Sequence, residues 1–212
     1  AWIDAMLEKD VPDWYVNSCK LIKYMFPKAH AVAYVMMAYR IAYFKVYYPI
    51  AYYSAFFSIR AANFDYEIMC MGKERLDEHL KDFIKREQNS KKQGSASDDE
   101  DAMSKKEKDM IKDMKLVQEM YARGISFVPI DLYKVSDTRF LIFDGKIMPS
   151  LSAIQGLGEK AAQNIVEGRK EGPFVSVEDL RIRTKITKTV LEVMKKNGIL
   201  DGMSETNQMS LF

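Results

Sequence analysis

The hydrophobic positions follow different patterns in successive parts of the chain. Residues 26–49 (FPKAHAVAYVMMAYRIAYFKVYYP) are apolar or aromatic almost all round a helix, with a few polar side chains between. Residues 73–87 and 106–124 place apolar side chains at the spacing of an amphipathic helix, and Gly124 suits the end of the second one. We therefore predict that residues 1–124 are helical.

The pattern changes after Gly124. Residues 125–150 alternate apolar and polar side chains and contain the turn dipeptide Asp144-Gly145, which predicts two or three short strands. Short helical segments follow, and residues suited to begin or end them stand at Ser150, at Ser176 with Asp179, at Thr187 and at Asn197-Gly198. The predicted fold class is mainly α with a small β element.

Residues 86–115 are polar, small and mixed in charge. Such a segment buries too little apolar surface to offset the entropy of ordering. We predict a disordered loop over about 90–104 between two helices. The aromatic residues are unevenly distributed. Of the 25, 17 precede residue 67, so we expect the first part of the chain to have a dense aromatic core.

Composition narrows the class of protein. The chain of 212 residues is 48% hydrophobic, carries a net charge of +2 and has two isolated cysteines. No zinc site, disulfide framework, signal peptide or membrane span is predicted, which favours a cytoplasmic chain. The chain begins with Ala1 rather than Met, so we expect a fragment of something longer.

The most specific local motif is IQGLGEKAAQNI. Gly156 and Gly158 flank Leu157 in a predicted tight turn between two helices, with Leu157 as its apolar anchor. The free amides of the turn and of the next helix, which begins near Glu159, would face an anion, with Lys160 beside them. This pattern is typical of a helix-hairpin-helix element that binds nucleic-acid backbone. The alternative is a purely structural turn, and Glu159 counts modestly in its favour.

Two further basic features accompany this hairpin. Arg169 and Lys170 stand at the end of the helix and are expected beside the hairpin. A second unit, residues 181–196 (RIRTKITKTVLEVMKK), holds six basic residues against one acidic residue and forms a degenerate pair with the first. A solvated helix face would explain such a charge run equally well.

The last residues, DGMSETNQMSLF, end in a polar leash followed by Gln208, Met209, Leu211 and Phe212. This composition indicates a linear peptide that fills an apolar pocket on a partner, with Gln208 making a polar contact. The alternative is that Leu211 and Phe212 fold back onto their own domain.

Taken in order, FPKAHAVAYVMMAYRIAYFKVYYP, FVPIDLYKVSDTRFLI, IQGLGEKAAQNI and NQMSLF resemble the C-terminal part of the PolC-type DNA polymerase III alpha subunits. The likeness spans essentially the whole chain and is weakest near residues 90–104. It implies three regions: a fingers-like helical domain at 1–124, a duplex-binding domain with tandem helix-hairpin-helix units at 125–206, and a clamp-binding tail at 207–212.

The resemblance also implies roles for individual residues. Lys28, His30 and Tyr34 match positions that meet the incoming dNTP, and the QMSLF tail matches the motif that binds the sliding clamp (beta subunit). Met209 stands where the family often has leucine. Methionine fills an apolar slot about as well as leucine does. Residues 156–160 would grip primer–template DNA through its backbone.

Catalysis requires carboxylates that hold two metal ions, and the sequence offers no convincing set. Asp65, Glu67 and the acidic run at 98–101 lack the context of a strand end. The resemblance implies that the palm carboxylates, their Mg²⁺ and the exonuclease region lie upstream, so no cofactor is expected in this chain and the isolated chain should be inactive. A stand-alone, non-catalytic DNA-binding adaptor that recruits the sliding clamp, and a purely structural helical domain, are the alternatives.

Overall fold

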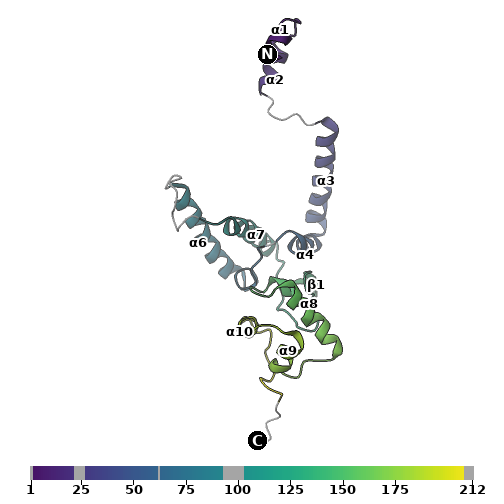
Figure 1. Cartoon of the computed structure of the whole chain (residues 1–212), viewed down its shortest axis with the longest axis vertical. Coiled ribbons are helices and arrows are strands. Elements are labelled where there is room, and N and C mark those ends of the chain that lie inside the picture. The colour runs from purple at the N-terminus through teal and green to yellow at the C-terminus, as the bar shows by residue number, and fades with distance from the viewer. Residues whose placement is uncertain (1, 22–26, 62, 93–102, 208–212) are drawn as a thin grey trace. The chain divides into compact units, whose positions relative to one another are not determined.

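The computed structural model describes all residues except 1, 22–26, 62, 93–102 and 208–212 (Figure 1). The chain divides into two compact units, residues 1–43 and 44–212. The described part is mainly helical with one two-stranded antiparallel sheet, which confirms the predicted fold class. Its elements are α1 (Trp2–Leu7), α2 (Asp13–Leu21), α3 (Lys28–Tyr47), α4 (Pro49–Ile59), α5 (Tyr66–Met69), α6 (Lys73–Lys92), α7 (Lys105–Ala122), β1 (Leu141–Phe143), β2 (Lys146–Met148), η1 (Leu151–Ala153), α8 (Glu159–Gly168), η2 (Arg169–Glu171), α9 (Val177–Thr184) and α10 (Lys188–Lys196).

The first unit contains α1, α2 and most of α3. None of the 20 residues of α3, all of which the structure describes, is buried. Its apolar side chains surround the helix rather than forming one stripe, so Tyr39 remains 77% exposed. Within the described ranges, no helix combines the length and the apolar character needed to cross a bilayer.

The second unit begins within α3, and its first core lies among α4, α6 and α7. Pro49 occupies the first turn of α4, where its missing amide costs no hydrogen bond. An aromatic cluster centres on Phe57, whose ring lies 5.3 Å from that of Phe64 and 5.7 Å from that of Phe140. Lys45, near the end of α3, pairs with Glu119 of α7 at 2.7 Å.

The two long helices α6 and α7 pack side by side. Ser104 and Glu107 form a complete capping box at the start of α7, and Met103 is buried. Helix α6 continues to Lys92, so the helix extends past residue 90, where the loop was predicted to begin. The remainder of that loop, 93–102, lies outside the described residues.

The sheet consists of β1 and β2, joined at the predicted Asp144-Gly145 turn. Both turn residues have positive φ, 49° and 72°, as a tight two-residue hairpin requires. Phe127 adds a single parallel bridge to Ile147 in place of a third strand.

The second core joins α8, α9 and α10. Leu157, Ile165 and Leu180 lie in it, and Tyr66 of α5 reaches into it from the preceding region. Glu67 bonds Lys196 at 2.9 Å, which ties α5 to the end of α10. The segment between β2 and α8 contacts both cores, since Leu151 and Ile154 lie in this one and Ala153 lies in the first.

Candidate nucleic-acid interface

The first hairpin, residues 154–159, joins η1 to α8. Gly156 has a φ of +83°, a conformation that L side chains rarely adopt. Leu157 is 5% exposed and its amide donates to the carbonyl of Ile154 at 3.1 Å. The buried Leu157 therefore anchors the turn, as predicted, and holds its outer backbone in a defined position.

Gly158 needs another explanation, because its φ of −70° is open to any residue. A Cβ placed on Gly158 would meet nothing within 4 Å. The sequence prediction that both glycines serve tight backbone geometry therefore applies to Gly156 alone. Neither the conformation nor the packing of the described chain requires a glycine at 158, which leaves room for close approach by a ligand.

Gly158 is also the N-cap of α8. Ala162 donates to its carbonyl at 3.0 Å, so the helical bonding begins there. A glycine has no side chain to accept a hydrogen bond from the first-turn amides, which consequently face outward with the positive end of the helix dipole. Lys160 is exposed in this first turn, and Glu159 beside it contributes an opposing charge.

The basic residues at the other end of α8 do not belong to this group, contrary to the prediction. Arg169 donates to the carbonyls of Leu132 and Val135 at 3.0 and 2.7 Å, and Lys170 pairs with Glu167 at 2.6 Å. They follow a helix of 10 residues, which separates them from the hairpin by about 15 Å. Arg169 has a structural role in holding the 132–135 loop.

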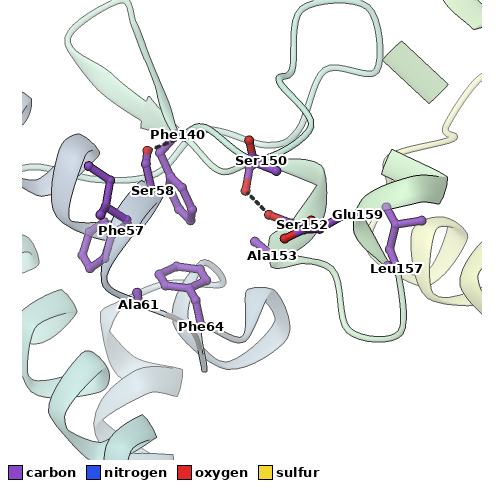
Figure 2. A pocket seen from close by; sticks show the side chains of 13 residues that line it. Phe57, Ser58, Ala61, Phe64, Phe140, Ser150, Ser152, Ala153, Leu157 and Glu159 are labelled. Atoms are coloured by element: carbon purple, nitrogen blue, oxygen red, sulfur yellow. Dashed lines mark hydrogen bonds between the residues drawn. The ribbon is translucent and has the colours of Figure 1, made fainter. Parts of the chain in front are cut away.

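Two cavities flank the first hairpin. One has a volume of about 380 Å³ and lies between the end of α4 and the hairpin (Figure 2). The other, of about 350 Å³, is lined by Asn63, Lys106 and the hairpin. Leu157 and Gly158 line both, so the turn is open on two sides.

The turn between α9 and α10 repeats the backbone of the first hairpin. Lys185 has a φ of +57°, Ile186 is 3% exposed, and Thr187 is the N-cap of α10 with a ψ of 159°, against 157° at Gly158. Ser176 and Thr187 cap their helices as predicted, through the amides of Asp179 and Val190. Ser150 does not: its hydroxyl lies 2.9 Å from that of Ser152, and the element that it begins is a short 3-10 helix.

Several of the basic residues in the segment 181–196 are used in packing. Arg183 donates to the carbonyls of Gly168 and Gly172 and lies over the ring of Phe174. Lys195 pairs with Glu205 and Lys196 with Glu67. The exposed basic side chains beside the second hairpin are Arg181, Lys185 and Lys188.

The predicted nucleotide-binding residues lie in the first unit on α3. The rings of His30 and Tyr34 are 4.6 Å apart in an edge-to-face arrangement, and Tyr34 is 67% exposed. Lys28 is the first residue of α3 and stands two positions before His30, so helical spacing places it on a different side. The structure brings together His30 and Tyr34 but not Lys28.

The predicted clamp-binding residues, Gln208, Met209, Leu211 and Phe212, lie outside the described residues. The chain just before them is held on the first turn of α9. The amides of Val177 and Glu178 donate to the carbonyls of Ser204 and Glu205 at 2.8 and 3.1 Å, and Ser176 donates to Asn207 at 2.6 Å.

The two acidic residues considered from the sequence that the structure describes, Asp65 and Glu67, each have a structural partner. Asp65 accepts from the amide of Ile68 at 3.1 Å, and the bond from Lys196 lowers the pKa of Glu67. Among the described residues, no three His, Cys, Asp or Glu side chains gather in a way that could hold a metal ion. The acidic run at 98–101 lies outside the described residues.

Comparison with known proteins agrees with the hairpin geometry. Residues 124–210 match the helix-hairpin-helix motif family. Over 98% of its length the chain is 49% identical to DNA polymerase III PolC-type of Clostridium perfringens, and over its whole length it is 44% identical to the Bacillus subtilis protein of that name. The chain is homologous to a segment of PolC-type DNA polymerase III. It spans 13% and 14% of these two relatives.

The resemblance to PolC-type proteins inferred from the sequence is thus confirmed, and so is the presence of a helix-hairpin-helix element. Sequence reasoning missed the cavities beside the first hairpin, since their walls come from segments far apart in the chain. It also missed the full equivalence of the second hairpin. A signal existed there, because a lone apolar Ile186 stands between a basic residue and a capping threonine.

Proposed function

We propose that this chain is part of a replicative DNA-directed DNA polymerase and that its first hairpin holds primer–template duplex by the sugar–phosphate backbone. The observation that supports this most directly is the open glycine N-cap of α8, in a chain homologous to PolC-type proteins over nearly all its length. Contacts to phosphate carry no base information, and a polymerase that moves along any sequence requires such contacts.

The wider proposal assigns a role to each region. Residues 1–124 form the fingers-like domain, where Lys28, His30 and Tyr34 meet the incoming dNTP. Residues 125–206 grip the duplex, and the 207–212 tail binds the sliding clamp. Catalytic carboxylates, Mg²⁺ and the exonuclease belong to other parts of the polymerase, in the cytoplasm.

Binding of the chain to two short duplexes of unrelated sequence tests the hairpin. We expect equal affinities that fall steeply between about 50 and 200 mM salt. Gly158→Glu, which the fold has room for, should weaken binding to both duplexes about tenfold or more, because a carboxylate would repel the phosphate. Gly145→Asn, in the β1–β2 turn, is the matched control. Equal affinity of Gly158→Glu and wild type would remove the hairpin from the interface.

The other two roles have separate readouts. Deletion of residues 208–212 should abolish capture by the sliding clamp and leave duplex affinity intact. In the full polymerase, His30→Ala and Tyr34→Ala should mainly raise the apparent KM for dNTP. Unchanged kinetics would remove both side chains from the nucleotide site.

A further inference from the structure

The segment just before the predicted clamp-binding residues is attached to the start of α9, and Figure 1 shows it beside that helix. The amide of Val177 donates to the carbonyl of Ser204 at 2.8 Å. The next amide along, that of Glu178, donates to the carbonyl of Glu205 at 3.1 Å. Amides in the first turn of a helix have no partner within that helix, so the segment satisfies them from outside.

Side chains reinforce this attachment. The hydroxyl of Ser176, the N-cap of α9, donates to the side-chain oxygen of Asn207 at 2.6 Å. The amide of Asn207 donates to the carboxylate of Glu178 at 3.3 Å, and Lys195 of α10 pairs with Glu205 at 2.6 Å. The attachment therefore extends to Asn207, so the segment is held on the helices rather than free as a leash would be.

The attached segment runs directly into the proposed clamp-binding residues. These begin at Gln208, the residue after Asn207, so no spacer separates the attachment from the peptide that would enter the partner's pocket. The five residues 208–212 span at most about 18 Å even when fully extended. A partner bound to them must consequently lie against the surface around the start of α9.

That surface carries exposed apolar side chains. Across residues 150–207, all of which the structure describes, the large apolar side chains that remain exposed are Val175 at 66% and Ile182 at 64%. Val175 precedes the N-cap of α9. Ile182 stands four positions after Glu178, so these two share a face of α9 and lie about 6 Å apart along its axis. Both apolar side chains are therefore within reach of a partner held at Asn207.

The charges beside the attachment favour a protein partner over DNA. A cavity of about 270 Å³ lies there, with Val177 and Leu191 as its apolar lining. Its charged lining is balanced, with three basic and three acidic side chains: Arg181, Lys188 and Lys195 against Glu178, Glu192 and Glu205. A site for a phosphate backbone is expected to have an excess of positive charge. A balanced mixture beside apolar residues suits the polar rim of a protein interface.

From these observations we infer that residues 204–207 form a rigid joint and that a sliding clamp bound to the tail also contacts the α9 surface at Val175 and Ile182. The inference rests on the proposed function, because it concerns the partner of the same tail. A five-residue peptide is small beside the roughly 20–30 residues that each side of a stable interface contributes. The joint supplies the additional contact and fixes where the clamp lies relative to α9.

Binding of the whole chain to a purified sliding clamp, without DNA, tests the surface. Val175→Lys with Ile182→Lys should weaken the affinity about tenfold, because two charges would enter an apolar contact. Both side chains are exposed, so the fold should tolerate the change. The matched control is Ile59→Lys, which places the same charge at a 78% exposed position on α4 and should leave the affinity unchanged.

An inserted spacer tests the joint. About ten Gly and Ser residues between Asn207 and Gln208 should weaken clamp affinity about fivefold, because the tail and the α9 surface would then bind as loosely connected sites. The same insertion in the exposed turn between Asp144 and Gly145 should leave clamp affinity unchanged, since such turns tolerate insertions.

Hydrogen exchange reports whether the joint persists in the complex. The amides of Val177 and Glu178 should exchange as slowly with the clamp bound as without it, or more slowly. Faster exchange on binding would mean that the segment leaves α9, which would overturn the inference. Ser176→Ala, which removes the bond to Asn207, should weaken clamp affinity about twofold to threefold. Ser104→Ala removes the N-cap hydroxyl of α7 and should not.

Deletion of residues 208–212 separates this inference from the proposed function. If the deletion abolishes clamp binding but the double lysine variant and the spacer variant bind with wild-type affinity, the joint and its surface are wrong and the tail proposal stands. If the wild-type chain does not bind the clamp, both fail.

Discussion

The two hairpins of the second unit share a backbone and differ in chemistry. In each, a residue with positive φ precedes a buried apolar anchor and then an extended N-cap. The first uses Gly156, Leu157 and Gly158, and the second uses Lys185, Ile186 and Thr187. The shared geometry follows from the anchor and the start of the next helix, so the flanking residues are free to differ.

That difference decides what each hairpin offers a ligand. Gly158 leaves the first-turn amides of α8 open, whereas the Thr187 hydroxyl accepts from the amide of Val190 and uses one of the corresponding groups in α10. The second hairpin instead presents exposed lysine side chains at 185 and 188. One turn is suited to close backbone contact, and the other to longer-range charge contact.

The largest expected effect comes from removing the anchors. Leu157→Ala and Ile186→Ala should each lower the free energy of unfolding by about 2–5 kcal/mol, because both side chains lie in the same core. Urea unfolding measures both. A cost well below 1 kcal/mol for either variant would mean that the anchor does not hold its turn.

An exchange of N-caps tests the functional difference directly. Gly158→Thr should leave stability unchanged or raise it by about a few tenths of a kcal/mol, since a hydroxyl could cap α8. It should also weaken duplex binding about tenfold by occupying the open amides. The reverse change, Thr187→Gly, should cost only a few tenths of a kcal/mol. Unfolding and anisotropy on the same samples separate the two effects, and undiminished DNA affinity in Gly158→Thr would break the proposed distinction.

Helix α7 carries a buried carboxylate, Asp113, whose neighbour Asn63 lines the second cavity beside the first hairpin. Burial, together with Asp109, raises the pKa of Asp113 from 3.8 to about 6, although the amide of Asn63, a residue of the second cavity, donates to it. Because the folded-state pKa is raised, the native state binds the proton more tightly, and stability from this group is lost as pH rises from about 4 to about 6.

Asp113→Asn should therefore be more stable than wild type by about 1–2 kcal/mol at pH 8, a figure reduced to allow for partial solvation, and equal to it near pH 4. Thermal unfolding across this pH range provides the measurement. If the stability of wild type and of the variant changed identically with pH, Asp113 would not be desolvated.

The smallest effects concern the positive-φ positions. Gly156→Ala should destabilise the chain by about 1 kcal/mol, whereas Lys185→Gly should be neutral or stabilising by a few tenths, since it relieves an unfavourable conformation at the cost of chain entropy. Chemical unfolding of the two variants gives the comparison. If both substitutions changed the free energy of unfolding in the same direction, the positive φ would not be a source of strain common to the two turns.

Local features were predictable from the sequence because their causes span only three or four residues. The caps at Ser176 and Thr187 and the turn at Asp144-Gly145 form as predicted, each through contacts among close neighbours. Ser150 is the exception: its hydroxyl lies beside that of Ser152, and the following element is too short to be an α-helix.

The use of the basic residues could not be predicted in the same way. Arg169, Arg183 and Lys196 belong to charge runs in the sequence, yet each bonds a carbonyl or a carboxylate brought to it by the fold. Whether a charged side chain meets solvent, a ligand or its own protein depends on neighbours distant along the chain.

By itself, the sequence determined the mainly helical class, the glycine hairpin and the homology to a segment of PolC-type polymerases. Each depends on local conformational preference or on residue order. Only the tertiary structure decided that Gly158 faces open space and that two cavities lie beside it. Phe140, which lines one of these cavities, is bonded by Ser54 from 86 positions away, and long-range packing of this kind leaves no local pattern in the sequence.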